Sequence, residues 1–68
     1  MKLSARNVFK GKVVELNHGV VNSVVKVDIG GGNVITSMIT VLAVEDLRIA
    51  VGDEVHVVIK SSDVMLAK

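Results

Sequence analysis

Hydrophobic and polar residues alternate along most of the chain, which is the pattern of strands whose two faces have different surroundings. Between residues 40 and 52 the pattern changes to the spacing of a short helix, for which Thr40 is a suitable N-cap. The alternating segments predict five strands, over residues 7–16, 20–29, 34–40, 53–60 and 63–68.

Glycine and asparagine mark the breaks between the first three strands. Asn17–Gly19 is a turn signal, and the glycine run Gly30–Asn33 predicts a tight hairpin, where positive φ is easily adopted. Gly11, inside the first strand, predicts a bend or bulge. Three strands, a short helix and two further strands are the element order of an OB-like small barrel. We therefore expect an all-β, five-stranded barrel with one short helix, formed by a single domain over residues 1–68.

Composition restricts how so small a barrel can be stabilised. Half of the 68 residues are hydrophobic, yet the chain has no Trp, Tyr or Cys and one Phe, Phe9, which we expect in the core. Disulfides and thiolate zinc sites are therefore excluded. Several hydrophobic residues are surplus to one small inner face, namely Val20, Val24, Val58 and Leu66. We expect neighbouring subunits to bury them, so that the barrel is assembled as an oligomer.

Charge and the length of the apolar segments indicate the cellular setting. The net charge is +1 with both signs scattered, which gives no strong attraction to nucleic acid or anionic lipid. No apolar run reaches the roughly 18 residues that span a bilayer, and the first residues lack the apolar core of a signal peptide. We expect a cytoplasmic protein with neither a membrane nor a nucleic-acid partner.

Residues capable of catalysis lack the arrangement that catalysis requires. His18 and His56 belong to no catalytic or metal-binding spacing, and the paired carboxylates at residues 45–46 and 53–54 are expected as solvated caps. Gly30–Asn33 is not a phosphate loop, because no GK[ST] follows it. We expect no enzyme, no catalytic residue and no metal cation held directly by the chain.

Two functions of other classes stay open. OB barrels commonly bind single-stranded nucleic acid, although that recognition needs stacking aromatic residues and a basic groove, and the chain has one Phe. The chain could instead be an inert structural assembly domain whose polar residues bind nothing. A gel shift with single-stranded DNA tests the first function, and the absence of any anion effect would indicate the second.

Two polar clusters near the ends of the chain suit an anion. The stretch LSARN carries Ser4 and Arg6, the stretch VIKSS carries Lys60 and Ser61, and neither contains a carboxylate. Guanidinium, ammonium and hydroxyl groups are hydrogen-bond donors, and Thr40 with the helix start after it adds further donors. Together they predict a donor-rich pocket for a small tetrahedral dianion. The alternative is that they are ordinary solvated side chains.

Five stretches carry a family resemblance in one register: SARN at 4–7, KGKVV at 10–14, IGGGN at 29–33, ITSMIT at 35–40 and VIKSSDVM at 58–65. With them the chain resembles the molbindins, small Mop-type proteins that bind molybdate or tungstate. The resemblance implies an OB-like fold assembled as a hexamer, a trimer of dimers, with the oxyanions held at subunit interfaces and no catalysis. Because these residues include no DNA-binding or ATPase segment, it also implies intracellular molybdenum storage or homeostasis.

The resemblance also assigns residues to the oxyanion site. Ser4 and Arg6 of one subunit are expected to meet a group from another subunit, which comprises Thr40, Ala43, Lys60 and Ser61. Ala5 and Asn7 would supply backbone contacts or hold the strand entry. Ala43 could donate only its backbone N–H.

A second class of anion site is implied near a threefold axis of the assembly. The candidates are His18, Gly19 and Val20, the last two through their backbone. His18 would add positive charge at acidic pH. A simple hairpin turn with an exposed histidine is the alternative.

Overall fold

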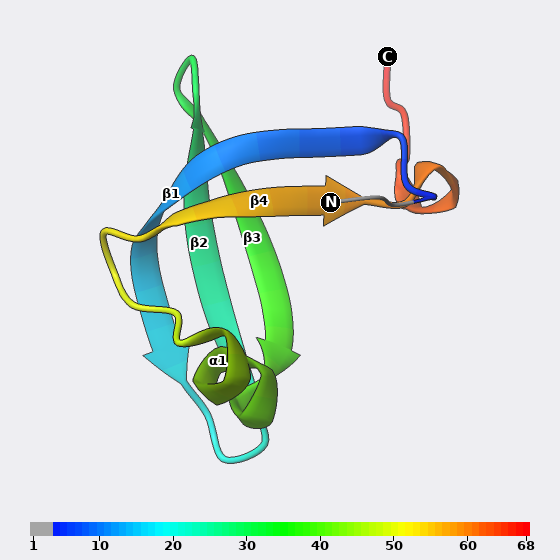
Figure 1. Ribbon diagram of the computed structural model, residues 1–68. Coiled ribbons are helices and arrows are strands. Elements are labelled where there is room, and N and C mark those ends of the chain that lie inside the picture. Colours follow the sequence, from blue (N-terminus) through cyan, green and yellow to red (C-terminus); the bar gives the residue numbers. More distant parts are fainter. Residues whose placement is uncertain (1–3) are drawn as a thin grey trace.

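One antiparallel sheet and one short helix make up the fold of the computed structural model, which describes residues 4–68. The sheet has the strand order β3-β2-β1-β4 (Figure 1). Its elements follow the chain as β1 (Asn7–His18), β2 (Asn22–Gly30), β3 (Asn33–Thr40), α1 (Val41–Leu47), β4 (Glu54–Ile59) and a 3₁₀ turn (Ser61–Asp63). The predicted all-β class, the first four strands and the helix are therefore confirmed, with small shifts in their bounds.

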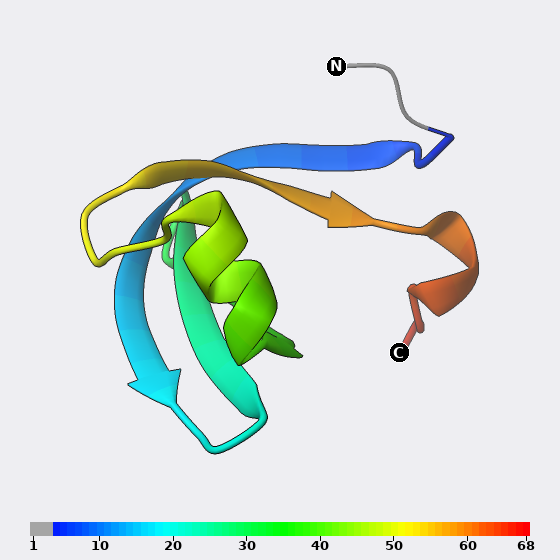
Figure 2. The same cartoon turned by 60° about the horizontal axis from the view of Figure 1, so that its bottom comes forward.

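The long strand β1 joins two parts of the sheet. Its first half pairs with β4, from Asn7 opposite Ile59 to Lys12 opposite Glu54, and its second half pairs with β2. Between these halves the strand bends sharply, so that β1 and β4 run across the β2–β3 hairpin (Figure 1). The curvature leaves a concave inner side, which α1 partly covers (Figure 2).

The sequence predicted a bend or bulge at Gly11, and the bend is found next to it. The halves of β1 that pair with β4 and with β2 meet at Lys12, whereas the register with β2 shifts between Val13 and Glu15, so the bulge does not lie at Gly11 itself. Gly11 serves close packing instead, because a Cβ there would lie 2.5 Å from Cγ1 of Val27 and 2.8 Å from the carbonyl oxygen of Asp28. Glycine is required at position 11 because β2 leaves no room there for a side chain.

The core is small and built almost entirely from valine. Val13, Val25, Val27 and Val44 are buried, and a shell of half-buried aliphatic residues from β1 to β4 packs against them. Val25 and Val27 alternate along β2 as the period-two pattern predicted. Phe9 does not join them, because the residue is 40% exposed, so its predicted place in the core is wrong.

Local chemistry explains where the hairpin and the helix begin and end. Gly30, Gly31 and Gly32 all adopt positive φ in the β2–β3 turn, as predicted from the glycine run. Thr40 caps α1, since its Oγ1 accepts a hydrogen bond from the Ala43 N–H at 3.0 Å. Arg48 ends the helix in the left-handed conformation, with φ of 53°.

The predicted fifth strand is absent from the single chain. Residues 61–63 form the 3₁₀ turn and residues 64–68 belong to no strand, so the sheet has four strands and stays open between β3 and β4. Met65 and Leu66 are each 92% exposed. A strand needs a partner edge, and the C-terminal segment lies on none. Among residues 4–68, no helix has the length and apolar content needed to cross a bilayer.

Candidate functional site

The pairing of β1 with β4 brings the two polar clusters of the sequence to one end of the sheet. Asn7 begins β1 opposite Ile59, the last residue of β4, and the Asn7 Nδ2 group donates a hydrogen bond to the Ile59 carbonyl oxygen at 3.2 Å. The residues just before Asn7 and just after Ile59 therefore lie side by side (Figure 1). We call this group the strand-end cluster; it comprises Ser4, Ala5, Arg6, Asn7, Lys60 and Ser61.

The strand-end cluster is rich in donors and poor in acceptors. The side chains of Arg6 and Lys60 are exposed, as are the hydroxyl-bearing residues Ser4 and Ser61. Within residues 4–68 the two ion pairs join Lys10 to Glu54 and Lys26 to Glu15, so neither cation of the cluster takes part in one. Cations without a carboxylate partner are available to bind an anion.

Thr40 and Ala43, the other predicted members of the site, lie at a different end of the molecule. Thr40 ends β3 opposite Asn22, where α1 begins, whereas the strand-end cluster lies beyond the far end of β4 (Figures 1 and 2). The curved length of β1 separates the two regions within one chain. One copy therefore brings six of the eight predicted residues together, and Thr40 and Ala43 could join them only from another copy.

The start of α1 offers fewer free donors than the sequence suggested. The Val41 N–H donates to the Val21 carbonyl oxygen at 2.8 Å, and the Ala43 N–H donates to Thr40 Oγ1. Two of the first three N–H groups of the helix are therefore committed within the chain, and that of Leu42 is the one left for an anion. The capping arrangement also leaves the Thr40 hydroxyl hydrogen available as a donor.

The residues of the possible second anion site lie at the α1 end of the molecule. His18 is the last residue of β1, and Gly19 and Val20 lead into the turn before β2. The Gly19 N–H donates to the Asn22 carbonyl oxygen at 2.9 Å, and a Cβ on Gly19 would collide with that oxygen. Val20 is 98% exposed. The turn is tightly closed, and the Gly19 N–H is committed to closing it.

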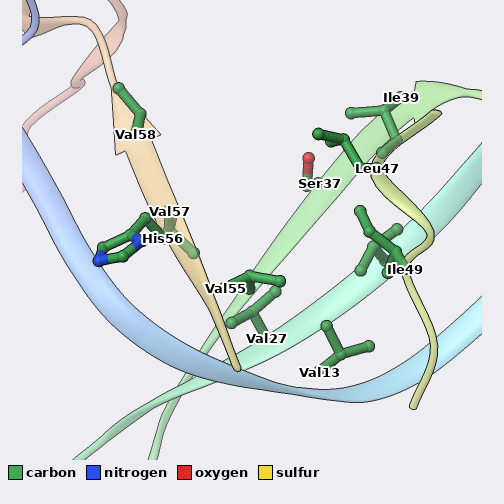
Figure 3. Close-up of a pocket in the computed structure, with 11 residues that line it drawn as sticks. Val13, Val27, Ser37, Ile39, Leu47, Ile49, Val55, His56, Val57 and Val58 are labelled. Atoms are coloured by element: carbon green, nitrogen blue, oxygen red, sulfur yellow. The ribbon is translucent and has the colours of Figure 1, made fainter. Parts of the chain in front are cut away.

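An apolar groove is the feature that sequence reasoning missed. It has a volume of about 360 Å³ and lies where the sheet is open, between β3 and β4. Figure 3 shows Val13 and Val27 at its base, Ile39 on one side and Val57 on the other. The alternation of Val55 and Val57 was visible in the sequence, but the pairing order that leaves these residues uncovered was not.

Metal binding finds no support in the side chains that the structure describes. Among residues 4–68 no group of three or more His, Cys, Asp or Glu side chains is arranged to hold a metal ion. Any ligand of the strand-end cluster would therefore be bound through hydrogen bonds to donors and not through coordination to a protein carboxylate or imidazole.

Removing the Thr40 hydroxyl tests the capping arrangement on its own. We expect Thr40→Ala to lower the free energy of unfolding by about 1 kcal/mol, because the Ala43 N–H loses its acceptor. Thr40→Ser keeps the oxygen, so its free energy of unfolding should lie within a few tenths of a kcal/mol of that of the parent. Urea unfolding followed by circular dichroism measures both, and equal stability of the alanine and serine variants would contradict the cap.

Fold and site define a small, mostly β protein that presents unpaired donors to an anion. The TOBE domain model matches residues 3–66. The chain is 50% identical over 66 residues to a probable molybdenum-pterin-binding protein of Haemophilus influenzae, a match that covers 97% of this chain and 96% of that protein.

Two solved structures share the fold. MopII from Clostridium pasteurianum matches with a TM-score of 0.92 at 49% identity, covering 98% of this chain and 100% of that one. The cytoplasmic molybdate-binding protein ModG, solved with molybdate bound, matches with a TM-score of 0.84 at 40% identity, covering 97% of this chain and 53% of that one.

The chain belongs to the TOBE family, as one of its Mop-type molybdenum-pterin- and molybdate-binding proteins. The resemblance to molbindins is thereby confirmed. The relatives are described as molybdenum-pterin-binding and molybdate-binding proteins.

Proposed function

We propose that this protein binds molybdate, and by the same chemistry tungstate, at sites formed where two copies meet. The observation that supports it most is the position of Arg6 and Lys60, which lie at one sheet end outside both ion pairs. The relative ModG was solved with molybdate bound and is 40% identical to this chain. In the proposed site, the strand-end cluster of one copy faces Thr40 and Ala43 of another.

The proposed mechanism is binding without chemistry. Molybdate is a tetrahedral dianion that loses water at the interface and receives charge-assisted hydrogen bonds from Arg6 and Lys60. The hydroxyls of Ser4, Ser61 and Thr40 add neutral donors. Asn7 holds the strand entry through its bond to Ile59 and so fixes the position of Arg6.

The proposed assembly is a hexamer, a trimer of dimers, in the cytoplasm. It would cover the hydrophobic side chains that one copy leaves exposed, among which Val20 and Met65 are each more than nine-tenths exposed. The role would be storage or homeostasis of molybdenum. A second oxyanion site at His18, Gly19 and Val20 belongs to the same proposal, with donors other than the Gly19 N–H, which closes the turn.

Selectivity against sulfate would depend on the size of the pocket, because sulfate has the same charge and shape as molybdate. Phosphate is partly protonated near neutral pH and would meet a cluster with no carboxylate to accept its proton. Sulfate that competes as well as molybdate in a displacement titration would contradict the argument from size.

Molybdate is expected to raise the melting temperature of the oligomer. A ligand bound only by the folded assembly stabilises it by mass action, by about 2.7 kcal/mol at 100 times the dissociation constant. Differential scanning fluorimetry with increasing molybdate, against matched sodium chloride, measures this shift. A melting temperature unchanged at saturating molybdate would count against the proposed sites.

A further inference from the structure

One carboxylate lies close to the strand-end cluster without belonging to it. Asp63 is the last residue of the 3₁₀ turn that directly follows Lys60, beyond the end of β4 (Figure 2). Its backbone N–H donates a hydrogen bond to the Lys60 carbonyl oxygen at 2.9 Å. Because this bond joins residues three positions apart, it holds their two Cα atoms within about 7 Å of each other. The fold therefore places a negative charge next to one of the two cations of the cluster.

The Asp63 carboxylate has no partner in the part of the chain that the structure describes. Asp28 and Asp53 each accept a hydrogen bond from a backbone N–H. Glu15 and Glu54 each form an ion pair with a lysine. The Asp63 side chain, in contrast, takes part in no hydrogen bond and no ion pair among residues 4–68. Its charge is therefore not neutralised by these residues.

The turn that carries Asp63 does not depend on the carboxylate. Backbone groups close it, through the Asp63 N–H and through the Val64 N–H, which donates to the Ser61 carbonyl oxygen at 3.3 Å. The Asp63 side chain is exposed. A neutral side chain would close the turn equally well, so the charge at this position has a consequence for an anion nearby and none for the hydrogen bonds of the turn.

We propose that Asp63 limits the affinity of the strand-end cluster for oxyanions. This inference rests on the proposed function and names a residue that tunes it. The carboxylate repels a bound dianion at a distance and competes with it for the Lys60 ammonium group. Charges within a Debye length of each other, about 8–10 Å at physiological salt, are only partly screened. A protein that stores an anion must also release it, and a carboxylate beside the site favours release.

Asp63→Asn tests this role, because it removes the charge and keeps the shape of the side chain. We expect the variant to bind molybdate about 2- to 5-fold more tightly than the parent, since partly screened repulsion between a carboxylate and a dianion is relieved. Isothermal titration measures the affinity. The midpoint of urea unfolding without molybdate should be unchanged, because the exposed side chain has no partner among residues 4–68.

Asp28→Asn is the matched control, because it removes the same charge from an exposed position far from both halves of the proposed site. Asp28 pairs with Lys12, which lies five residues along β1 from Asn7, a path of about 17 Å. It also lies six residues along β2 from Asn22, the partner of Thr40. Asparagine keeps an oxygen for the hydrogen bond that Asp28 accepts. The affinity for molybdate should change less than twofold.

The charge of the ligand separates repulsion from a change in the shape of the site. Perrhenate is a tetrahedral oxyanion with a single charge, so repulsion by a carboxylate is half as large as for molybdate. The gain in affinity of Asp63→Asn for perrhenate should therefore be about the square root of the gain for molybdate. Both gains should shrink as sodium chloride is added. Equal gains for the two anions that persist at high salt would overturn the electrostatic role.

The parent protein distinguishes failure of this inference from failure of the proposed function. Heat from the parent with molybdate, but no tighter binding by Asp63→Asn, would overturn the affinity-limiting role and leave the proposed function standing. Absence of heat from the parent would overturn the proposed function, and the role of Asp63 with it. Tighter binding by Asp63→Asn, with Asp28→Asn unchanged, is the expected result.

Discussion

Arg6→Ala and Lys60→Ala are each expected to weaken molybdate binding by roughly 10- to 150-fold. A hydrogen bond to a charged group contributes about 1.5–3 kcal/mol, and each 1.4 kcal/mol is a factor of ten in affinity. Both side chains lie in the strand-end cluster outside the ion pairs of residues 4–68, so their loss disrupts no ion pair, and in the proposed site it removes a contact with the anion. Isothermal titration of each variant measures the effect.

Lys12→Ala is the matched control, because it removes the same charge from an exposed position in β1 away from the strand-end cluster. It should change the affinity for molybdate less than twofold, since exposed charges at a distance are screened by salt. The affinity of Arg6→Lys for molybdate should lie between that of Arg6→Ala and that of the parent, because lysine keeps the charge and loses the planar fork of donors. Equal losses of affinity in Arg6→Ala and Lys12→Ala would show that molybdate binding depends only on the net charge of the protein.

Gly11→Ala is expected to lower the free energy of unfolding by about 1–3 kcal/mol, through overpacking. The added Cβ would lie 2.5 Å from a methyl carbon of Val27 and 2.8 Å from the Asp28 carbonyl oxygen. Val27 is only 3% exposed and the carbonyl belongs to the backbone of β2, so neither can move away cheaply. Chemical unfolding of the variant beside the parent measures the loss.

A double-mutant cycle separates the effect of overpacking against Val27 from the effect of replacing a glycine as such. Val27→Ala alone should destabilise the core. In the Gly11→Ala background the same substitution also removes one of the two clashes. The double variant should therefore lose less stability than the sum of the two single losses. Strict additivity would contradict a direct contact between positions 11 and 27. A fully stable Gly11→Ala variant would contradict the close approach of β1 and β2.

Local features of this fold could be predicted because local chemistry determines them. The alternating valines of β2, the glycine hairpin at residues 30–32 and the Thr40 cap are each fixed within a few residues of sequence. The fifth strand could not be predicted correctly for one chain, because Val64–Leu66 has a strand-like composition but a strand also requires an edge to pair with. The close packing at Gly11 could not be predicted for a similar reason, since the crowding comes from β2.

The candidate site likewise has a part that the sequence predicts and a part that depends on how distant strands pair. The donor-rich composition around Arg6 and Lys60 is readable from the sequence, and that composition by itself indicates an anion as the ligand. Their adjacency depends on a pairing between Asn7 and Ile59, which are 52 residues apart, and period-two patterns do not say which strands pair. That Thr40 and Ala43 lie at another end of the chain follows from the curvature of β1; Gly11 indicated a bend in this strand, but not its direction.

The most direct test of molybdate binding at the strand-end cluster is isothermal titration of the purified protein with molybdate, repeated in the presence of excess sulfate. Saturable heat that persists in sulfate is the expected result, with affinity that falls in Arg6→Ala. Absence of heat, or heat abolished by sulfate, would contradict a selective oxyanion site and leave a small β protein with a general anion-attracting surface.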